Sequence, residues 1–191
     1  MKYEVSAYPS SFLTLALQPG EQIITERGTL IFAEGEYTFE NKIEAKSYKN
    51  WVVKAFGGKS LAYNVYTAKE EAQLAFSPKD SAEIFTIEVT AERSIIFEPS
   101  LHFARTAGVD IVLKKSNWKN TLNDGLKLIS QGEGTLFLKG YGKIIAQEID
   151  TTQPMYLDET ALIAFEDTVE VETISKGVKE LITSGEGFLL A

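Results

Sequence analysis

The chain has 191 residues, of which 44% are hydrophobic and 11% aromatic, so it can bury a core and does not have a disordered composition. The net charge of −8 argues against nucleic-acid binding driven by bulk charge, which needs concentrated Lys and Arg. The absence of cysteine excludes disulfides, thiolate zinc sites and cysteine nucleophiles, and a single histidine excludes multi-histidine metal sites.

The first strands that we predict belong to a pattern that the chain contains three times, at residues 13–32, 85–103 and 145–164. Each copy holds an apolar anchor residue, an apolar pair, an acid two residues beyond the pair, and then a leucine. In the first two copies the anchor ends an apolar run that alternates with period two. The apolar pairs are Ile23-Ile24, Ile95-Ile96 and Met155-Tyr156. Because alternation with period two is typical of half-buried strands, we predict an all-β fold of three tandem modules, at about residues 1–70, 71–142 and 143–191.

Each module continues into a looser segment that ends in glycines, at residues 52–66, 126–142 and 178–191. We expect short helical turns before these glycines, which would act as C-terminal caps, and a strand after them. Units one and two then continue into returning strands at residues 71–76 and 143–146, whereas the third unit stops at Ala191. The N-terminal strand, residues 2–5, is predicted to complete the third unit, within its own chain or from a neighbouring one. The three units therefore form one domain.

Four segments resemble the "altered inheritance of mitochondria" family: Pro19-Gly20-Glu21 and residues 137–142, 161–172 and 184–187. The resemblance implies three modules in pseudo-threefold packing, each similar to the subunit of the tryptophan RNA-binding attenuation protein, a double-stranded β-helix. It also implies a homo-oligomer, with a trimer favoured, whose nine modules close a ring. The fungal member is associated with organisation of the mitochondrial inner membrane and not with a reaction.

The acids of the repeat, Glu26, Glu98 and Asp158, are candidate binding residues because all three units keep them. They could bind a cation through oxygen ligands around a pseudo-threefold axis. Alternatively, each carboxylate accepts N–H hydrogen bonds in a turn. Repetition favours the turn, because a binding site usually diverges between copies, and no metal or cofactor is assigned.

Two further features are interpreted as structural. His102 aligns with Ile31 and Ile163, and a position that accepts isoleucine twice is a packing position. Residues 57–60, Gly-Gly-Lys-Ser, imitate the end of a phosphate-binding loop, but a strand-like segment follows them instead of a helix.

Basic and aromatic residues gather in two loops, residues 41–59 and 114–127. The candidates are Lys49, Trp51, Lys54, Lys115, Trp118 and Lys119. These loops could form a basic rim that meets anionic lipid head groups or stacks on single-stranded RNA. A charged, solvent-facing loop with the tryptophans tucked beneath it is the favoured interpretation.

The sequence thus predicts a non-enzymatic oligomeric scaffold or interaction protein, because it offers no constellation of nucleophile, acid and base. Membrane-surface association through the basic loops is a further expectation, and a ring-shaped module that binds RNA or a small ligand is the alternative. No apolar run approaches the ~18 residues of a membrane-spanning helix, so we expect a cytoplasmic protein.

Overall fold

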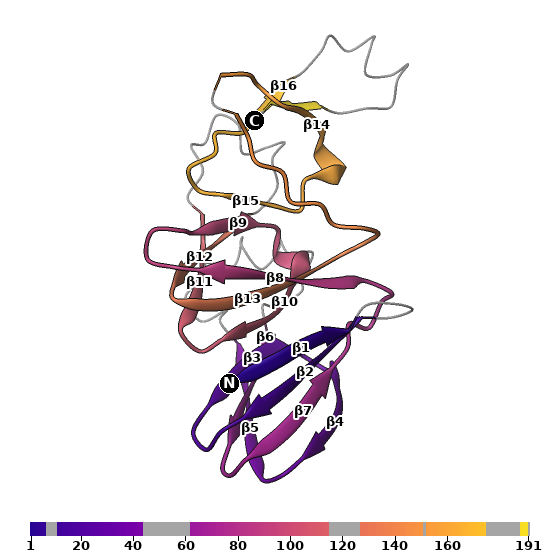
Figure 1. Ribbon diagram of the computed structural model, residues 1–191, viewed down its shortest axis with the longest axis vertical. Coiled ribbons are helices and arrows are strands. Elements are labelled where there is room, and N and C mark those ends of the chain that lie inside the picture. The colour runs from indigo at the N-terminus through magenta and orange to yellow at the C-terminus, as the bar shows by residue number, and fades with distance from the viewer. Residues whose placement is uncertain (7–10, 44–61, 115–126, 151, 175–187, 191) are drawn as a thin grey trace.

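The computed structural model describes the chain except for residues 7–10, 44–61, 115–126, 151, 175–187 and 191. The described residues form an all-β fold, which confirms the predicted fold class. The elongated molecule carries its N-terminal strands at one end and its C-terminal strands at the other (Figure 1). Its three units follow one another along the long axis, in the order of the sequence.

The strands can be assigned to three consecutive units, and β7, at Ala72–Phe76, belongs with the first unit, beyond the boundary predicted at residue 70. The first unit contains β1 (Lys2–Ser6), β2 (Phe12–Leu17), β3 (Gln22–Glu26), β4 (Leu30–Glu34), β5 (Tyr37–Ile43), β6 (Ala62–Ala68) and β7 (Ala72–Phe76). The second contains β8 (Glu83–Val89), β9 (Ile95–Phe97), the 3-10 turn η2 (Pro99–Leu101), β10 (His102–Thr106), β11 (Val109–Leu113), β12 (Leu128–Gly132) and β13 (Gly134–Gly140). The third contains β14 (Tyr156–Asp158), the 3-10 turn η3 (Glu159–Ala161), β15 (Ala164–Glu166), β16 (Glu172–Ile174) and β17 (Phe188–Leu190).

Units one and two pair their strands in the same way, and every pair is antiparallel. In unit one, β7 lies between β2 and β4, while β6 lies between β3 and β5. In unit two, β13 lies between β8 and β10, while β12 lies between β9 and β11. In unit three, β17 pairs with β14 and β16. The repeat in sequence is therefore also a repeat in topology.

The alternation in β2 places Leu13, Leu15 and Leu17 in the core, where none of the three is exposed. Leu15 lies opposite Leu74 of β7, so both side chains lie on the same face of the sheet. After β2 the chain turns at Gly20, whose φ of 84° favours glycine and whose N–H donates to the carbonyl of Ala68 at 2.8 Å. These features assemble the first unit around one apolar face.

Glu21 fixes the N-terminus against the first turn. Its carboxylate forms an ion pair with the N-terminal ammonium group and accepts the N–H of Gln18 at 2.8 Å. The hydrogen bond from the ammonium group, followed by the one from Gln18, lowers the pKa of Glu21 below its ordinary value. The contact places β1 beside β2, with Tyr3 opposite Leu15.

Strands also pair between units. The six-stranded sheet β5-β6-β3-β10-β13-β8 joins units one and two through β3 and β10, and the sheet β11-β12-β9-β15 joins units two and three through β9 and β15. A closed pseudo-threefold packing would also need a pair between units three and one. Among the described residues β14 pairs only with β17, and β4 only with β7. Pseudo-threefold closure is therefore not confirmed.

Two local predictions are wrong. Residues 143–146 form no strand, and β13 is the strand that returns to the sheet in unit two. Residues 128–132 form β12, where the sequence suggested a helical turn, because Leu128 and Ile129 pair with Phe97 and Ile96 of β9. The short helical turns that the described residues do form, η2 and η3, follow the acids of the repeat. The predicted turns before the other glycines lie outside the described residues.

The N-terminal strand joins the first unit, where β1 pairs with β2 in the sheet β1-β2-β7-β4. Within the chain, none of the described strands of unit three contacts β1 as a sheet partner. Completion of the third unit by this strand from a neighbouring chain stays a prediction, since β1 is an edge strand.

Candidate interaction surface

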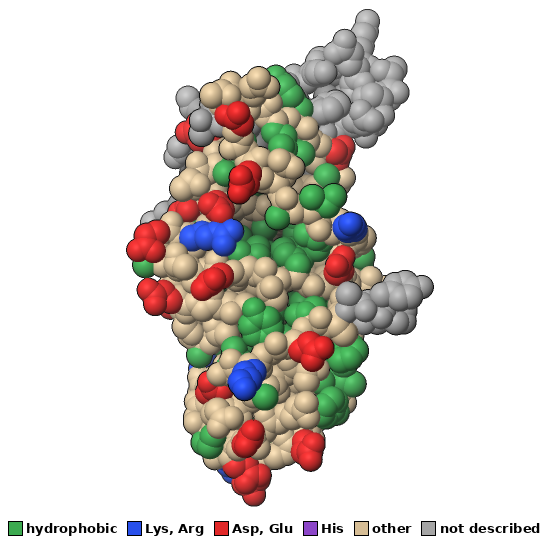
Figure 2. Space-filling view, in the orientation of Figure 1, with side chains coloured by type: hydrophobic (Ala, Val, Ile, Leu, Met, Phe, Trp, Pro, Cys, Tyr) green, Lys and Arg blue, Asp and Glu red, His purple; other side chains and the backbone are tan. Residues whose placement is uncertain are grey.

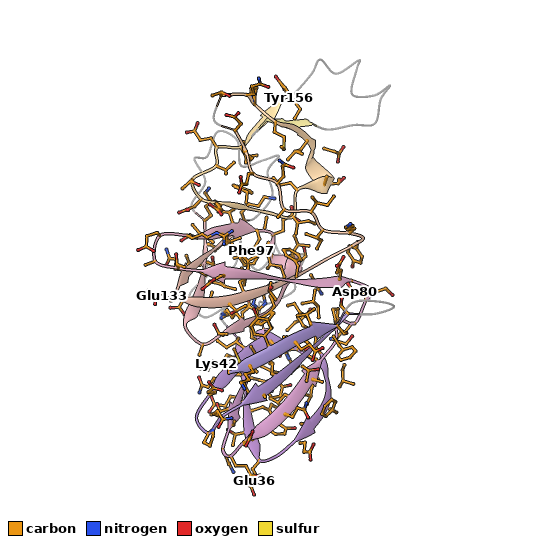
Figure 3. All side chains as sticks on the ribbon, viewed as in Figure 1. Glu36, Lys42, Asp80, Phe97, Glu133 and Tyr156 are labelled. Atoms are coloured by element: carbon orange, nitrogen blue, oxygen red, sulfur yellow. The ribbon has the colours of Figure 1, made fainter. Side chains whose placement is uncertain are left out.

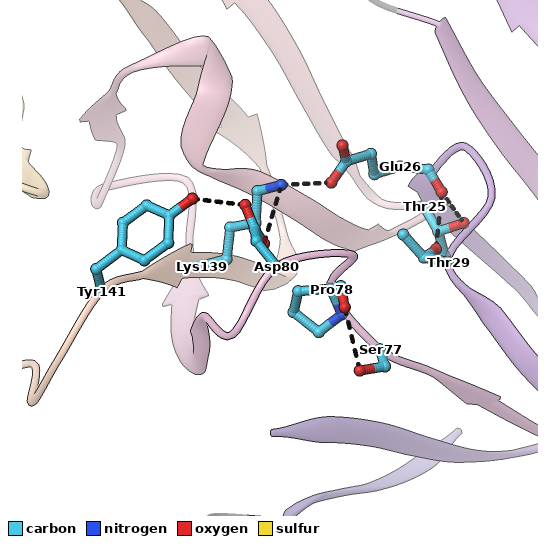
Figure 4. A network of polar contacts seen from close by, with 8 residues as sticks. All are labelled: Thr25, Glu26, Thr29, Ser77, Pro78, Asp80, Lys139 and Tyr141. Atoms are coloured by element: carbon cyan, nitrogen blue, oxygen red, sulfur yellow. Dashed lines mark hydrogen bonds and ion pairs between the residues drawn. The ribbon is translucent and has the colours of Figure 1, made fainter. Parts of the chain in front are cut away.

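The acid that follows the apolar pair ends a strand in unit one and forms an ion pair across to unit two. Glu26 is the last residue of β3, and its Oε2 accepts a hydrogen bond from Nζ of Lys139 on β13 at 2.7 Å (Figure 4). The backbone carbonyl of Glu26 accepts from the hydroxyl of Thr29 at 2.8 Å. The side chain and the backbone carbonyl of Glu26 are therefore both held by contacts at the junction between the units.

Lys139 also approaches a second carboxylate, in the connection between β7 and β8. Its Nζ lies 4.0 Å from Oδ1 of Asp80, whose Oδ2 accepts the hydroxyl of Tyr141 at 2.6 Å (Figure 4). The hydrogen bond from Tyr141 is the main reason that the pKa of Asp80 is lowered, and the same bond raises the pKa of Tyr141. One lysine thus joins β3, the connecting segment and β13.

The equivalent acids have different partners. Glu98 accepts from Nζ of Lys127 at 2.8 Å, within unit two. Asp158 caps η3 by accepting the N–H of Thr160 at 2.8 Å, and it also accepts the hydroxyl of Thr160, which together lower its pKa. The structure therefore places the three acids in three separate contacts. No three carboxylate or histidine side chains are grouped as metal ligands in the described parts of the chain.

The six candidates of the basic loops, Lys49, Trp51, Lys54, Lys115, Trp118 and Lys119, lie outside the described residues. At the borders of the loops, Lys42 on β5 is exposed, and Lys114 lies 5.6 Å from the ring centre of Phe165. The basic rim therefore stays a prediction.

A buried cluster lies where units one and two meet. Arg105 of β10 donates from Nε to the carbonyl of Val109 at 3.0 Å, and its guanidinium group lies 4.6 Å from the ring centre of Tyr63 on β6. His102 lies edge-on to Tyr63, with 4.8 Å between ring centres, and 6.5 Å from the ring of Phe97. His102 is buried, as the repeat predicts. Burial, then the charges of Arg105 and Lys139, lowers the pKa of His102 well below its ordinary value of 6.5.

Exposed apolar side chains mark the two strands that end the row of units. Ile31 and Phe32 on β4 are 55% and 44% exposed, and Tyr156 on β14 is 61% exposed. Hydrophobic side chains line the flank of the first unit where β4 runs (Figure 2), and Tyr156 lies at the far end of the molecule from Glu36, just beyond β4 (Figure 3). The sequence analysis did not single out these residues as a surface. The signal was present, because they occupy repeat positions that are apolar in every unit.

The topology and the repeat can now be compared with known proteins. A family model described as "Mitochondrial biogenesis AIM24" matches residues 3–191. The chain belongs to this family. The match confirms the resemblance seen in the four sequence segments.

One solved structure has a fold similar to that of this AIM24-family chain. It is the crystal structure of protein SPYM3_0169 from Streptococcus pyogenes, which aligns with a TM-score of 0.74 and 16% sequence identity. The alignment covers 99% of this chain and 87% of that chain. A comparison with curated proteins gives no match. In the described residues, no helix has the length and apolar character to cross a membrane.

Proposed function

We propose that this AIM24-family protein is the subunit of a homo-oligomeric, non-enzymatic scaffold. The observation that carries the proposal is the pair of end strands, β4 and β14, each of which has one edge without a partner strand among the described residues and also carries exposed apolar side chains. Open edges present unpaired N–H and C=O groups, which natural proteins cover or protect. Apolar side chains beside such an edge favour association over solvation.

Two further copies of the chain can cover both surfaces, because each copy brings one β4 and one β14. An oligomer built in this way needs no ligand and no reaction, which agrees with the proposed role as a scaffold. The family resemblance favours three chains in a closed ring, and we adopt the trimer as the proposed state.

Light scattering after size-exclusion chromatography tests the proposal. The wild-type protein at micromolar concentration should elute as a multiple of its 21.2 kDa mass. A single monomeric species would overturn the proposal.

A matched pair of variants places the contact. Phe32→Lys should reduce the mass toward that of the monomer, because it puts a charge into the apolar contact. Phe39→Lys is the control, since Phe39 is 57% exposed on the edge strand β5 but belongs to neither end strand. Equal loss of mass in both variants would contradict the assignment to β4.

Recruitment to an anionic membrane surface is a second part of the proposal and rests on the basic loops. Binding to vesicles that contain anionic lipid, weakened by Lys115→Ala and Lys119→Ala, is expected. Equal binding to neutral vesicles would overturn it. Single-stranded RNA is the alternative ligand for the same loops, and binding that is lost steeply with salt would favour it.

A further inference from the structure

The two contacts between units follow one rule. The strand that carries the apolar pair in one unit pairs with the strand that follows the leucine in the next unit: β3 with β10, and β9 with β15. Thr25 and Phe97, which each come directly after the apolar pair, lie opposite Ala104 and Ala164. Both contacts are antiparallel, so the second repeats the geometry of the first.

The same rule predicts which kind of strand would pair with β14 and which would pair with β4. β14 begins at Tyr156, the second residue of the third apolar pair, so it is the equivalent of β3 and β9, but among the described residues no strand takes the place beside it that β10 takes beside β3. β4 is the equivalent of β10 because both pair with the returning strand through the same bulge. Leu30 lies opposite Phe76 as His102 lies opposite Leu138, and Phe32 lies opposite Ala75 as Ala104 lies opposite Phe137. Among the described residues, no strand of another unit pairs with β4.

Burial at equivalent positions supports the assignment. Ile31 is 55% exposed and Phe32 is 44% exposed, whereas their equivalents in unit two, Phe103 and Ala104, are completely buried. At the other end, Tyr156 is 61% exposed, while its equivalent Ile96 is completely buried and Ile24 is partly buried. These positions are buried where a neighbouring unit covers the strand, and they are exposed where no described strand of another unit pairs with it.

We infer that β14 of one copy pairs antiparallel with β4 of the next copy, in the register that the two internal contacts share. This inference rests on the proposed function, which supplies the second copy. The register places Leu157 opposite Phe32, Tyr156 opposite Ala33, and Met155 opposite Glu34. No two acids face each other among these pairs. The contact is heterologous, with a different surface on each partner, so each copy offers a further β4 or β14 to another copy.

A second copy fits these edges because the chain already makes this contact twice with its own units. An unrelated strand could pair its backbone with either edge, but it would not reproduce one register at both ends. Glu36 and Tyr156 lie at opposite ends of the molecule (Figure 3), so residues near them can meet only between copies.

Cysteine cross-linking tests the register, and the chain has no cysteine of its own that could interfere. Directly opposed residues of antiparallel strands have Cα atoms ~4.5–5.5 Å apart, which suits a disulfide. The variant that combines Glu34→Cys with Met155→Cys should convert the 21.2 kDa band into covalent multiples on a non-reducing gel. Reduction should return the single band.

The matched control combines Glu40→Cys, on the edge strand β5, with Met155→Cys. It should stay monomeric on the same gel. A second pair in the predicted register, Phe32→Cys with Leu157→Cys, should also cross-link, which guards against a local defect in the first pair.

The outcomes separate the two proposals. An oligomer in which neither predicted pair cross-links, or in which the control cross-links equally, overturns the inferred register and leaves the scaffold standing. A monomeric wild-type protein overturns both.

Discussion

The burial of His102 makes the stability of the fold depend on pH. The side chain lies between the rings of Tyr63 and Phe97, and Nε2 is 3.4 Å from Arg105. Burial beside this cation disfavours the imidazolium form, which lowers the pKa of His102 in the folded state. In the unfolded chain, the same side chain returns to a pKa of about 6.5.

The sign of the pH dependence of stability follows from the number of protons that the folded and unfolded states bind. Below about pH 6.5 the unfolded chain takes up a proton that the folded protein does not, so stability falls as the pH falls. Each pH unit below this value costs at most about 1.4 kcal/mol for one proton, so the loss between pH 7.5 and 5.0 is at most about 2 kcal/mol. The carboxyl groups with lowered pKa, such as Asp80, add to the loss only near and below their ordinary value of 3.8.

Urea unfolding followed by circular dichroism at several pH values between 5.0 and 7.5 measures this slope. His102→Leu provides the comparison, because the equivalent position of unit one is Leu30. The variant should have a stability that is nearly independent of pH across this window. If the wild type and His102→Leu show the same slope, the neutral buried histidine is not its source and the argument fails.

Three further changes test the contacts that hold the units. Lys139→Met should lower the free energy of unfolding by about 1–2 kcal/mol, because Glu26 loses its partner at 2.7 Å; urea unfolding measures this, and an unchanged midpoint would contradict it. Gly132→Ala should cost about 2–4 kcal/mol, since a Cβ would lie 2.3 Å from the carbonyl oxygen of Gly108. Gly20→Ala, at a similar positive φ with nothing within 4 Å, should cost only about 1–2 kcal/mol. Equal thermal shifts for the two glycine variants would refute the steric argument.

The sequence predicted the all-β class and the order of the strands in the first two units because the repeat and the period of two are local signals. The alternation of Leu13, Leu15 and Leu17 requires one buried face, and the structure provides it. Residues 145–149, at the corresponding place in the third copy, form no strand. A strand also needs a neighbour with free N–H and C=O groups, and a local pattern does not show whether that neighbour is present.

The alignment of the repeat also needed the structure. The sequence placed Ile31 opposite His102 in the repeat, whereas strand pairing makes Leu30 its equivalent. Leu30 and His102 each lie six residues after the second residue of the apolar pair, Ile24 and Ile96, so alignment on the leucines Leu30 and Leu101 misplaced the second copy by one residue. Strand pairing shows that the apolar pair, and not the leucine, is the correct reference point. Leu30 is apolar, as Ile31 is, so the prediction that His102 is buried was right despite the misalignment.

The candidate residues differ in how far along the sequence their contact partners lie. Asp158 bonds within its own turn, and a sequence pattern can indicate such a contact. Glu26 meets Lys139, which is 113 positions away, through the pairing of two units. No spacing rule connects those two residues, so the candidate site could be named from the sequence but its partners could not.

The hydrophobic clusters of units one and two each include side chains from the next unit. The cluster of unit one includes Phe103 and Phe137 from unit two, and that of unit two is packed by Ala164 from unit three. Units one and two therefore complete their apolar burial with side chains from the next one. In unit three, β14 has no partner beyond β17 among the described strands, and its Tyr156 is exposed. Because the chain completes each of its cores from the next unit, a second copy is the partner that would extend the same packing.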